Sequence, residues 1–253
     1  PSTRILDRQG RLLYEIVDPE GGRNRAVTLD RIPQDCIDAT IATEDANFYR
    51  HIGVDLAGIL RALRINLAGG EVIAGGSTIT QQVARNLLLD PEQRAERTLL
   101  RKLRETILAI RLTASYSRDD ILLLYLNQTY YGNLAYGLEG AAQAYFGEAV
   151  ETLDLAQCAL LAGLPQAPAV YNPLENPEAA RERQKTVLRL MTGQGYITQE
   201  EARRAENEPL QFAAAPFPIE APHFVMAVWE ELTRRFPEAL YQGGLTVTTT
   251  LDL

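Results

Sequence analysis

The chain has few of the residues on which metal centres and disulfide-rich proteins depend. Its 253 residues include only two cysteines, two histidines and one tryptophan. Neither the cysteines nor the histidines stand at the spacing of a metal-binding motif, so the sequence indicates no zinc site. Cys36 and Cys158 lie in apolar helical patterns and are predicted to be buried thiols; their positions leave open whether a disulfide joins them.

The chain also lacks an excess of positive charge. It has 25 basic residues against 33 acidic ones, which gives a net charge of −8. Proteins that bind nucleic acid through their overall field are basic, so we expect no nucleic-acid partner. A local cluster of basic side chains could still bind a smaller anion.

Long hydrophobic runs and two well-known motifs are absent. No run approaches the roughly 18 apolar residues of a membrane-spanning helix, and no signal peptide is visible. The chain begins at Pro1 without a methionine, so we expect an excised piece of a longer polypeptide. It contains no Ser-x-x-Lys of a serine acyl enzyme, and the Gly75-Gly76 segment lacks the lysine of a P-loop.

Apolar residues make up 46% of the chain, enough for a sizeable core in one large domain or two small ones. Strand patterns stand at the two ends, in Arg4–Leu6 and Leu12–Val17 around a turn and again in Leu245–Leu251. Helical patterns fill the chain between them, at residues 33–44, 56–67, 90–110, 119–126, 152–161, 177–191, from a cap at 198, and 222–236. The sequence therefore predicts a mainly α fold with a small N-terminal β-hairpin.

Two adjacent carboxylates, Glu44 and Asp45, lie close in sequence to Phe48 and His51. Glu44 ends an apolar helical segment, so its carboxyl group is expected at the edge of a core. Burial there raises the pKa of a carboxyl group toward values that suit proton transfer. The simpler alternative is a helix end whose charges are solvated.

A further carboxylate, Glu105, stands on an unusually basic predicted helix. Arg97, Arg101 and Glu105 are spaced four residues apart and would share one helix face, and Lys102 stands three residues before Glu105. Such a face is commonly a solvated surface with ion pairs. The crowding of basic residues at positions 85, 94, 97, 101, 102 and 104 of an acidic chain favours an anion-binding surface instead.

The segment between these carboxylates is rich in glycine. Gly75-Gly76 precedes a predicted helix that Ser77 or Thr78 would cap, and such a helix start suits a phosphate or carboxylate, although most only cap themselves. The apolar segment 56–73 before it could be a lid, a membrane-dipping element or an ordinary surface loop. Two carboxylates suggest glycosidic chemistry, and cations beside the second one suggest a phosphorylated leaving group.

Five ordered motifs resemble one family. Glu44-Asp45-x-x-Phe48-x-x-His51-x-Gly53, Gly75 to Gln82, Arg101-Lys102-x-x-Glu105, Ile121 to Asn127 with Gly132, and the region 161–165 are similar to those of the peptidoglycan glycosyltransferase domain of bacterial class A penicillin-binding proteins, glycosyltransferase family 51. The resemblance spans essentially the whole chain. One departure is Arg85, where many members carry lysine; the charge is kept, but a planar fork of donors replaces a single point donor.

The resemblance implies a mainly helical, lysozyme-like bilobal fold with a membrane-facing lobe, and an enzyme that polymerises lipid II with inversion and releases undecaprenyl pyrophosphate. Glu44 would be the general base, and Glu105 would assist the leaving pyrophosphate, directly or through a divalent cation (Mg²⁺ or Mn²⁺), with no organic cofactor. The residues expected to hold the substrate or shape its cleft are Asp45, Phe48, His51, Ser77, Thr78, Gln82, Arg85, Asn86, Arg97, Arg101 and Lys102.

The resemblance also implies partners and a location. Residues 1–30 would be a hairpin and linker, 31–215 the glycosyltransferase domain, and 216–253 the start of a linker toward a transpeptidase domain that the chain does not include. The enzyme would act at the outer face of the cell membrane, anchored by an N-terminal segment absent from this chain. It would bind the growing glycan strand, other cell-wall synthesis proteins and moenomycin-type inhibitors.

Two alternatives predict different activities. A lysozyme-like hydrolase or lytic transglycosylase would cut finished peptidoglycan and would not need the basic face between residues 97 and 102. A catalytically silent helical module would only bind a membrane or a partner and would not turn over lipid II.

Overall fold

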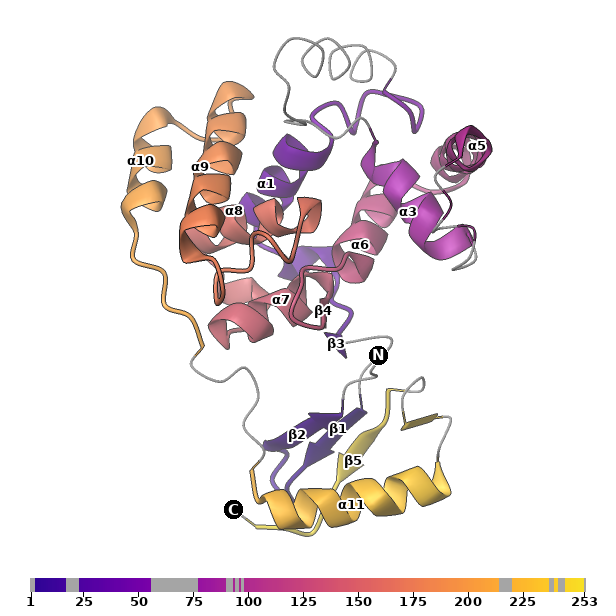
Figure 1. The fold of residues 1–253 in the computed structure, drawn as a ribbon, viewed down its shortest axis with the longest axis vertical. Coiled ribbons are helices and arrows are strands. Elements are labelled where there is room, and N and C mark those ends of the chain that lie inside the picture. Colours follow the sequence, from indigo (N-terminus) through magenta and orange to yellow (C-terminus); the bar gives the residue numbers. More distant parts are fainter. Residues whose placement is uncertain are drawn as a thin grey trace.

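The computed structural model describes residues 3–16, 23–55, 77–89, 93, 96, 98–213, 220–236, 239–240 and 244–252. This part of the chain is mainly helical, as predicted, and Figure 1 shows a helical body with a small sheet and one helix at its end. The apolar segment 56–73, which was expected to form the membrane-facing lobe, lies outside the described residues. Within the described residues, no helix combines the length and apolar character needed to cross a membrane.

The helices and strands follow one another along the chain in a simple order. The strands are β1 (Thr3–Leu6), β2 (Leu12–Ile16), β3 (Arg23–Asn24), β4 (Ala135–Tyr136) and β5 (Thr246–Thr248). The α-helices are α1 (Gln34–Glu44), α3 (Ile79–Leu88), α5 (Leu99–Ser115), α6 (Arg118–Gln128), α7 (Gly137–Phe146), α8 (Leu155–Gly163), α9 (Pro177–Gly193), α10 (Gln199–Asn207) and α11 (Pro222–Arg235).

The two ends of the chain build one small sheet. The predicted hairpin is confirmed, with β1 antiparallel to β2, and β5 adds to the other edge of β1 in parallel. Ile5, Leu13 and Ile16 form an apolar core with Val225 and Leu232 of α11, which runs alongside the sheet (Figure 1). The domain boundaries stay a prediction, but the N- and C-terminal segments, which were assigned separately, belong to one sheet.

The helical body is held together by close packing of α1, α8 and α9. Alanine side chains line the contact, and the shared core of this group contains Ala39, Ala42, Ala156, Ala159, Ala162, Val187, Leu188 and Met191. Small side chains let helix backbones approach one another closely. On the other side of α1, a larger core contains Phe48 and the apolar faces of α6 and α7.

Cys36 and Cys158 form a disulfide between α1 and α8, so the prediction of free buried thiols was wrong. Both residues are buried, with 1% of their surface exposed. The two thiols meet because the alanine-lined helices come so close that the two Cα atoms are 4.5 Å apart. The bond joins residues 122 positions apart in the chain, and the sequence alone does not show that two such distant residues meet.

The predicted helix from residue 90 to 110 does not run unbroken. Thr98 has an extended backbone, and its hydroxyl accepts a hydrogen bond from the Arg101 N–H group, so a new helix, α5, begins at Leu99. A side-chain cap therefore overrides the apolar periodicity that suggested one helix. Residues 90–92, where the start was predicted, and Arg97 lie outside the described residues. The helix cap predicted at residue 198 is confirmed, since Thr198 forms a capping box with Glu201.

The disulfide yields a first prediction. Replacing both cysteines by alanine (Cys36→Ala, Cys158→Ala) should lower the free energy of unfolding by about 2 to 5 kcal/mol, because the bond closes a long loop in the unfolded chain. Urea unfolding followed by circular dichroism measures this change. An oxidised wild-type protein with the same urea midpoint as the double variant would contradict it.

Candidate active site

Glu44 ends α1 and faces α3. The next residue, Asp45, leaves the helical conformation with a φ of −160°, which stops the helix there. The Nε2 group of Gln82, in the second turn of α3, donates a hydrogen bond of 2.6 Å to Oε2 of Glu44. Glu44 as a residue is half-buried, and its carboxylate is oriented by this neighbour.

The pKa of Glu44 is raised, as expected for a carboxyl group at the edge of a core. Burial is the main cause, because it penalises the charged form, and the neighbouring charge of Asp45 adds to it. The Gln82 hydrogen bond and the charges of Arg183 and Arg85 act in the opposite direction. Burial prevails, and the group is shifted toward the range in which a base works near neutral pH.

Asp45 joins the end of α1 to the start of α3. Its carboxylate accepts a hydrogen bond of 3.1 Å from the Ile79 N–H group, the first of α3, and both its oxygens lie 2.9 Å from Nε2 of His51. The Gly53 N–H group donates to Nδ1 of His51 over 3.0 Å, so the neutral imidazole carries its proton on Nε2 and donates it to Asp45. These contacts give Asp45 and His51 a supporting place beside Glu44.

The loop that follows is clamped onto α5 and α6. Phe48 is fully buried, and the Arg118 guanidinium lies 5.7 Å from the centre of its ring and donates to the His51 carbonyl. Gly53 has a φ of +98°, and a Cβ atom there would lie 2.6 Å from the Ala109 carbonyl oxygen. Only glycine permits both the backbone conformation and this close approach.

Glu105 lies buried between two cations. Only 1% of its surface is exposed, Nη1 of Arg101 donates to Oε1, and Nζ of Lys102 donates to Oε2 over 3.1 Å. The same Lys102 Nζ donates to the Ser77 hydroxyl over 2.7 Å, just before α3. Lys102 therefore connects α5 to the start of α3.

The N-terminal half of α3 lies between the two carboxylates. Thr78, not Ser77, caps α3 in a capping box with Gln81, and Gln81 also donates to Thr106 of α5 over 3.1 Å. Gln82 contacts Glu44, while Ser77, just before the helix, contacts the Glu105 cluster. The two predicted carboxylates therefore border one region of the structure.

The remaining predicted residues differ in how the structure places them. Arg85 and Asn86 are half-buried on α3, one turn beyond Gln82, and the Arg85 charge acts on Glu44. Arg97 lies outside the described residues, and α5 begins two residues beyond it, at Leu99.

The surroundings of Glu105 do not fit a divalent cation. Both carboxylate oxygens already accept hydrogen bonds from cationic side chains, and Mg²⁺ or Mn²⁺ needs several oxygen ligands of its own. The described residues also contain no group of three or more histidine, cysteine or acidic side chains that could hold a metal ion. The two cationic side chains suit a bound anion rather than a metal ion.

Sequence reasoning missed three side chains near Glu44. Tyr125 and Tyr131 are buried, and their pKa values are raised mainly by burial and further by the Glu44 charge. Arg183 of α9 interacts electrostatically with Glu44 as well. The tyrosines could only be classed as core residues and Arg183 as a charge on an amphipathic helix, because each reaches Glu44 through tertiary packing.

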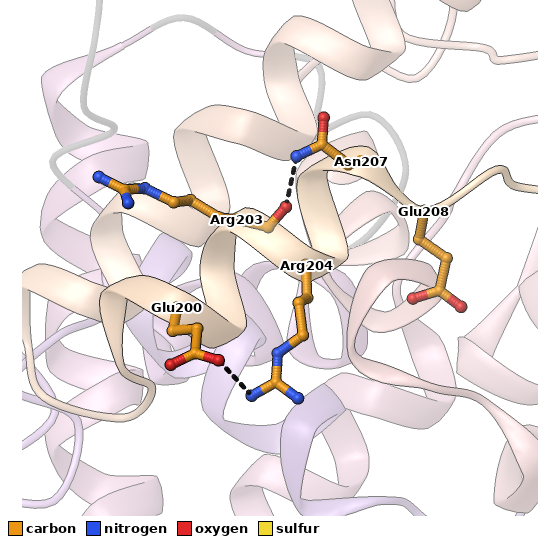
Figure 2. Close-up of a pocket in the computed structure, with 5 residues that line it drawn as sticks. All are labelled: Glu200, Arg203, Arg204, Asn207 and Glu208. Atoms are coloured by element: carbon orange, nitrogen blue, oxygen red, sulfur yellow. Dashed lines mark hydrogen bonds and ion pairs between the residues drawn. The ribbon is translucent and has the colours of Figure 1, made fainter.

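A shallow hollow on α10 is a weaker candidate. Figure 2 shows its lining, which consists of Glu200, Arg203, Arg204, Asn207 and Glu208. Arg204 and Glu200 pair over 3.8 Å, and Asn207 donates to the Arg203 carbonyl, so these exposed side chains mostly satisfy one another along the helix. No residue singled out above lies in it.

Comparisons with known proteins agree with the motifs. A family model described as "Transglycosylase" matches residues 9–192. The chain is 43% identical to penicillin-binding protein 1A of Aquifex aeolicus over its whole length and 43% identical to that of Escherichia coli over 94% of it. It spans only 34% and 28% of these two proteins, about a third of the length of the relatives it matches.

The fold leads to the same group of proteins. The crystal structure of penicillin-binding protein 1A from Haemophilus influenzae matches all of this chain, and 27% of its own, with a TM-score of 0.57 and 27% sequence identity. The mainly helical, lysozyme-like fold expected from the sequence is thereby confirmed. Because the family model covers most of the chain and extends over both carboxylates of the site, the chain belongs to the transglycosylase family.

Proposed function

We propose that this domain is a peptidoglycan glycosyltransferase that polymerises lipid II into β-1,4 glycan strands and releases undecaprenyl pyrophosphate. One observation carries the proposal: a half-buried carboxylate with a raised pKa and a buried carboxylate between two cations border the same half of α3. The first arrangement suits a base, and the second suits the binding of a leaving pyrophosphate.

Glu44 acts as the general base in this proposal. It removes the proton from the 4-hydroxyl group of the acceptor sugar, whose oxygen then attacks the anomeric carbon of the lipid-linked chain with inversion. The Gln82 hydrogen bond to Oε2 leaves Oε1 to take the proton. The raised pKa makes Glu44 a stronger base than an exposed carboxylate.

The cations around Glu105 stabilise the charge that develops on the leaving pyrophosphate. Glu105 is too buried to meet the substrate in the described arrangement, so its part is to fix Arg101 and Lys102 before the reaction begins. Preorganised cations lower the barrier because they need no reorganisation in the transition state. Ser77, Thr78, Gln82, Arg85, Asn86 and Arg97 complete the donor site, with Asp45, Phe48 and His51 shaping the cleft around the base.

The substrate implies the setting of the reaction. A polyprenyl pyrophosphate stays in a bilayer, so the domain works at a membrane surface, with the apolar segment 56–73 as its contact and an anchor outside this chain. The Cys36–Cys158 disulfide supports the outer face, since disulfides persist in oxidising compartments. The growing glycan strand, cell-wall synthesis proteins and moenomycin-type inhibitors at the donor site are the partners that follow.

A lytic enzyme is the nearest competing function. A lytic reaction releases no pyrophosphate, so it would not need the cations Arg101 and Lys102 that are held around Glu105. Incubation with lipid II should give longer glycan strands on a gel, and incubation with intact peptidoglycan should release no soluble fragments. The opposite pair of results would establish the lytic reaction.

The base assignment predicts a large loss of rate. Glu44→Gln should reduce polymerisation about 10²- to 10⁴-fold, because the amide cannot accept the proton while the side chain keeps its shape. Gel analysis of strands made from labelled lipid II measures the rate, and far-ultraviolet circular dichroism checks the fold. Near-normal synthesis by the variant would falsify the assignment.

The raised pKa of Glu44 also predicts how stability depends on pH. The folded protein binds this proton more tightly than the unfolded chain, so the contribution of Glu44 to stability is lost as pH rises from the ordinary glutamate value through the raised one. Glu44→Gln should therefore have a higher Tm than the wild type at neutral pH, with the difference shrinking as pH falls to about 4. Thermal melts across this range provide the test, and a constant difference at every pH would contradict the prediction.

The leaving-group site predicts a charge-specific effect at Lys102. Lys102→Met should lower kcat about 10²- to 10³-fold, in line with the loss of one preorganised donor, and Lys102→Arg should recover part of the rate. Lys185→Met on α9 is the matched control, because Lys185 pairs only with glutamates of the surface. Equal effects of the two methionine variants would show that Lys102 has no special role.

A further inference from the structure

Arg183 differs from the other charged residues of α9 in where its side chain lies. Lys185 and Arg189 of the same helix contact side chains of their own neighbourhood, Glu182 and Thr186. Arg183 instead extends from α9 to the C-terminal end of α8, where its Nε group donates to the Gly163 carbonyl over 3.2 Å. It is half-buried, and burial lowers the pKa of its guanidinium.

Two further contacts hold the Arg183 side chain in this place. Its guanidinium carbon lies 5.7 Å from the centre of the Tyr171 ring, a cation–π arrangement. Its stem passes so close to Gly163 that a Cβ atom there would lie 2.8 Å from Cγ of Arg183. A side chain fixed by a ring, a carbonyl and a tight passage is far more confined than a surface arginine.

The helix that carries Arg183 also packs against α1. Helices α1, α8 and α9 pack as one group (Figure 1), and Nε2 of Gln194, just beyond α9, donates to the Ala42 carbonyl in the last turn of α1 over 2.9 Å. The Arg183 guanidinium and the Glu44 carboxylate act on each other electrostatically. Among the cations that act on Glu44, Arg183 has the larger effect and Arg85 the smaller.

The main charged and titratable groups that act on Glu44 come from several elements. Asp45 follows it on the chain, Arg85 faces it from α3, Tyr125 and Tyr131 from α6 and the residues after it, and Arg183 from α9. The tyrosines are neutral near pH 7, and Asp45 already pairs with His51. The two cations come from different helices, Arg85 from α3 and Arg183 from α9.

We propose that Arg183 is a positioning residue for the reaction: fixed by Tyr171 and the end of α8, it places the positive charge that keeps the Glu44 carboxylate ionised in its half-buried site. This inference rests on the proposed role of Glu44 as the base. Burial favours the protonated form of Glu44, and a fixed positive charge that does not occupy the carboxylate oxygens favours the ionised form without blocking the acceptor.

The test measures the titration of Glu44 itself in the intact domain. Carboxyl carbon-13 NMR of glutamate-labelled protein, with Glu44→Gln to assign the signal, should show the pKa of Glu44 rise in Arg183→Gln by on the order of half a unit to one unit. On its acidic side, the pH profile of kcat/KM for lipid II should shift to higher pH by the same amount. Below this transition the variant should be about three- to tenfold slower than the wild type, and above it the two rates should converge.

Two variants separate charge from packing. Arg183→Lys keeps the charge and should leave the titration of Glu44 close to that of the wild type, even if its Tm falls. Arg189→Gln removes the same charge from an exposed position of α9 and should change neither the titration nor the pH profile.

The outcomes distinguish this inference from the proposed function. An unchanged Glu44 titration in Arg183→Gln overturns the inference, as does an equal shift in Arg189→Gln. A rise in KM at every pH with an unchanged titration makes Arg183 a substrate contact and overturns it too. If the titration moves as expected but Glu44→Gln still polymerises lipid II, the electrostatic pairing stands and the base assignment fails.

Discussion

The carboxylate of Asp45 is the contact on which the site depends. It accepts the first N–H group of α3 and the Nε2 proton of His51, so three segments that follow one another in the chain meet at a single buried group. A negative charge at the start of a helix also interacts favourably with the helix dipole. Because α3 is held there, Gln82 is held against Glu44, and the position of the base follows from that of its neighbour.

The same helix connects the base to the cations. The α3 start contacts Lys102 through Ser77, and Gln81 in its first turn contacts Thr106, so α3 and α5 cannot shift along one another without breaking polar contacts. Glu105 is the more deeply buried of the two carboxylates. Surrounded by Arg101 and Lys102, it is a buried charge with partners, and removing either partner would leave an uncompensated charge.

Local features of the chain were predictable, and tertiary contacts were not. Glu44 at a helix end, Thr78 at a helix start and the terminal hairpin all follow from patterns within about ten residues of chain. The break before α5 is also a local feature, because the Thr98 hydroxyl caps the helix that begins at Leu99. The apolar periodicity across this position is the stronger signal in the sequence, and it predicts one continuous helix. The Cys36–Cys158 bond, the pairing of β1 with β5 and the approach of Arg183 to Glu44 join residues more than a hundred positions apart. The spacing of residues in a single sequence does not reveal such long-range contacts.

The sheet at the end of the molecule has a consequence for the order of folding. β1 comprises Thr3–Leu6 and its parallel neighbour β5 comprises Thr246–Thr248, so a ribosome must complete nearly the whole chain before the two can pair. Until then β1 and β2 form only a two-stranded hairpin, which is marginal by itself in water. The helical body, whose strands and helices lie between these ends, can assemble first. Residues of β1 are therefore made before the helical body but reach their final partner after it.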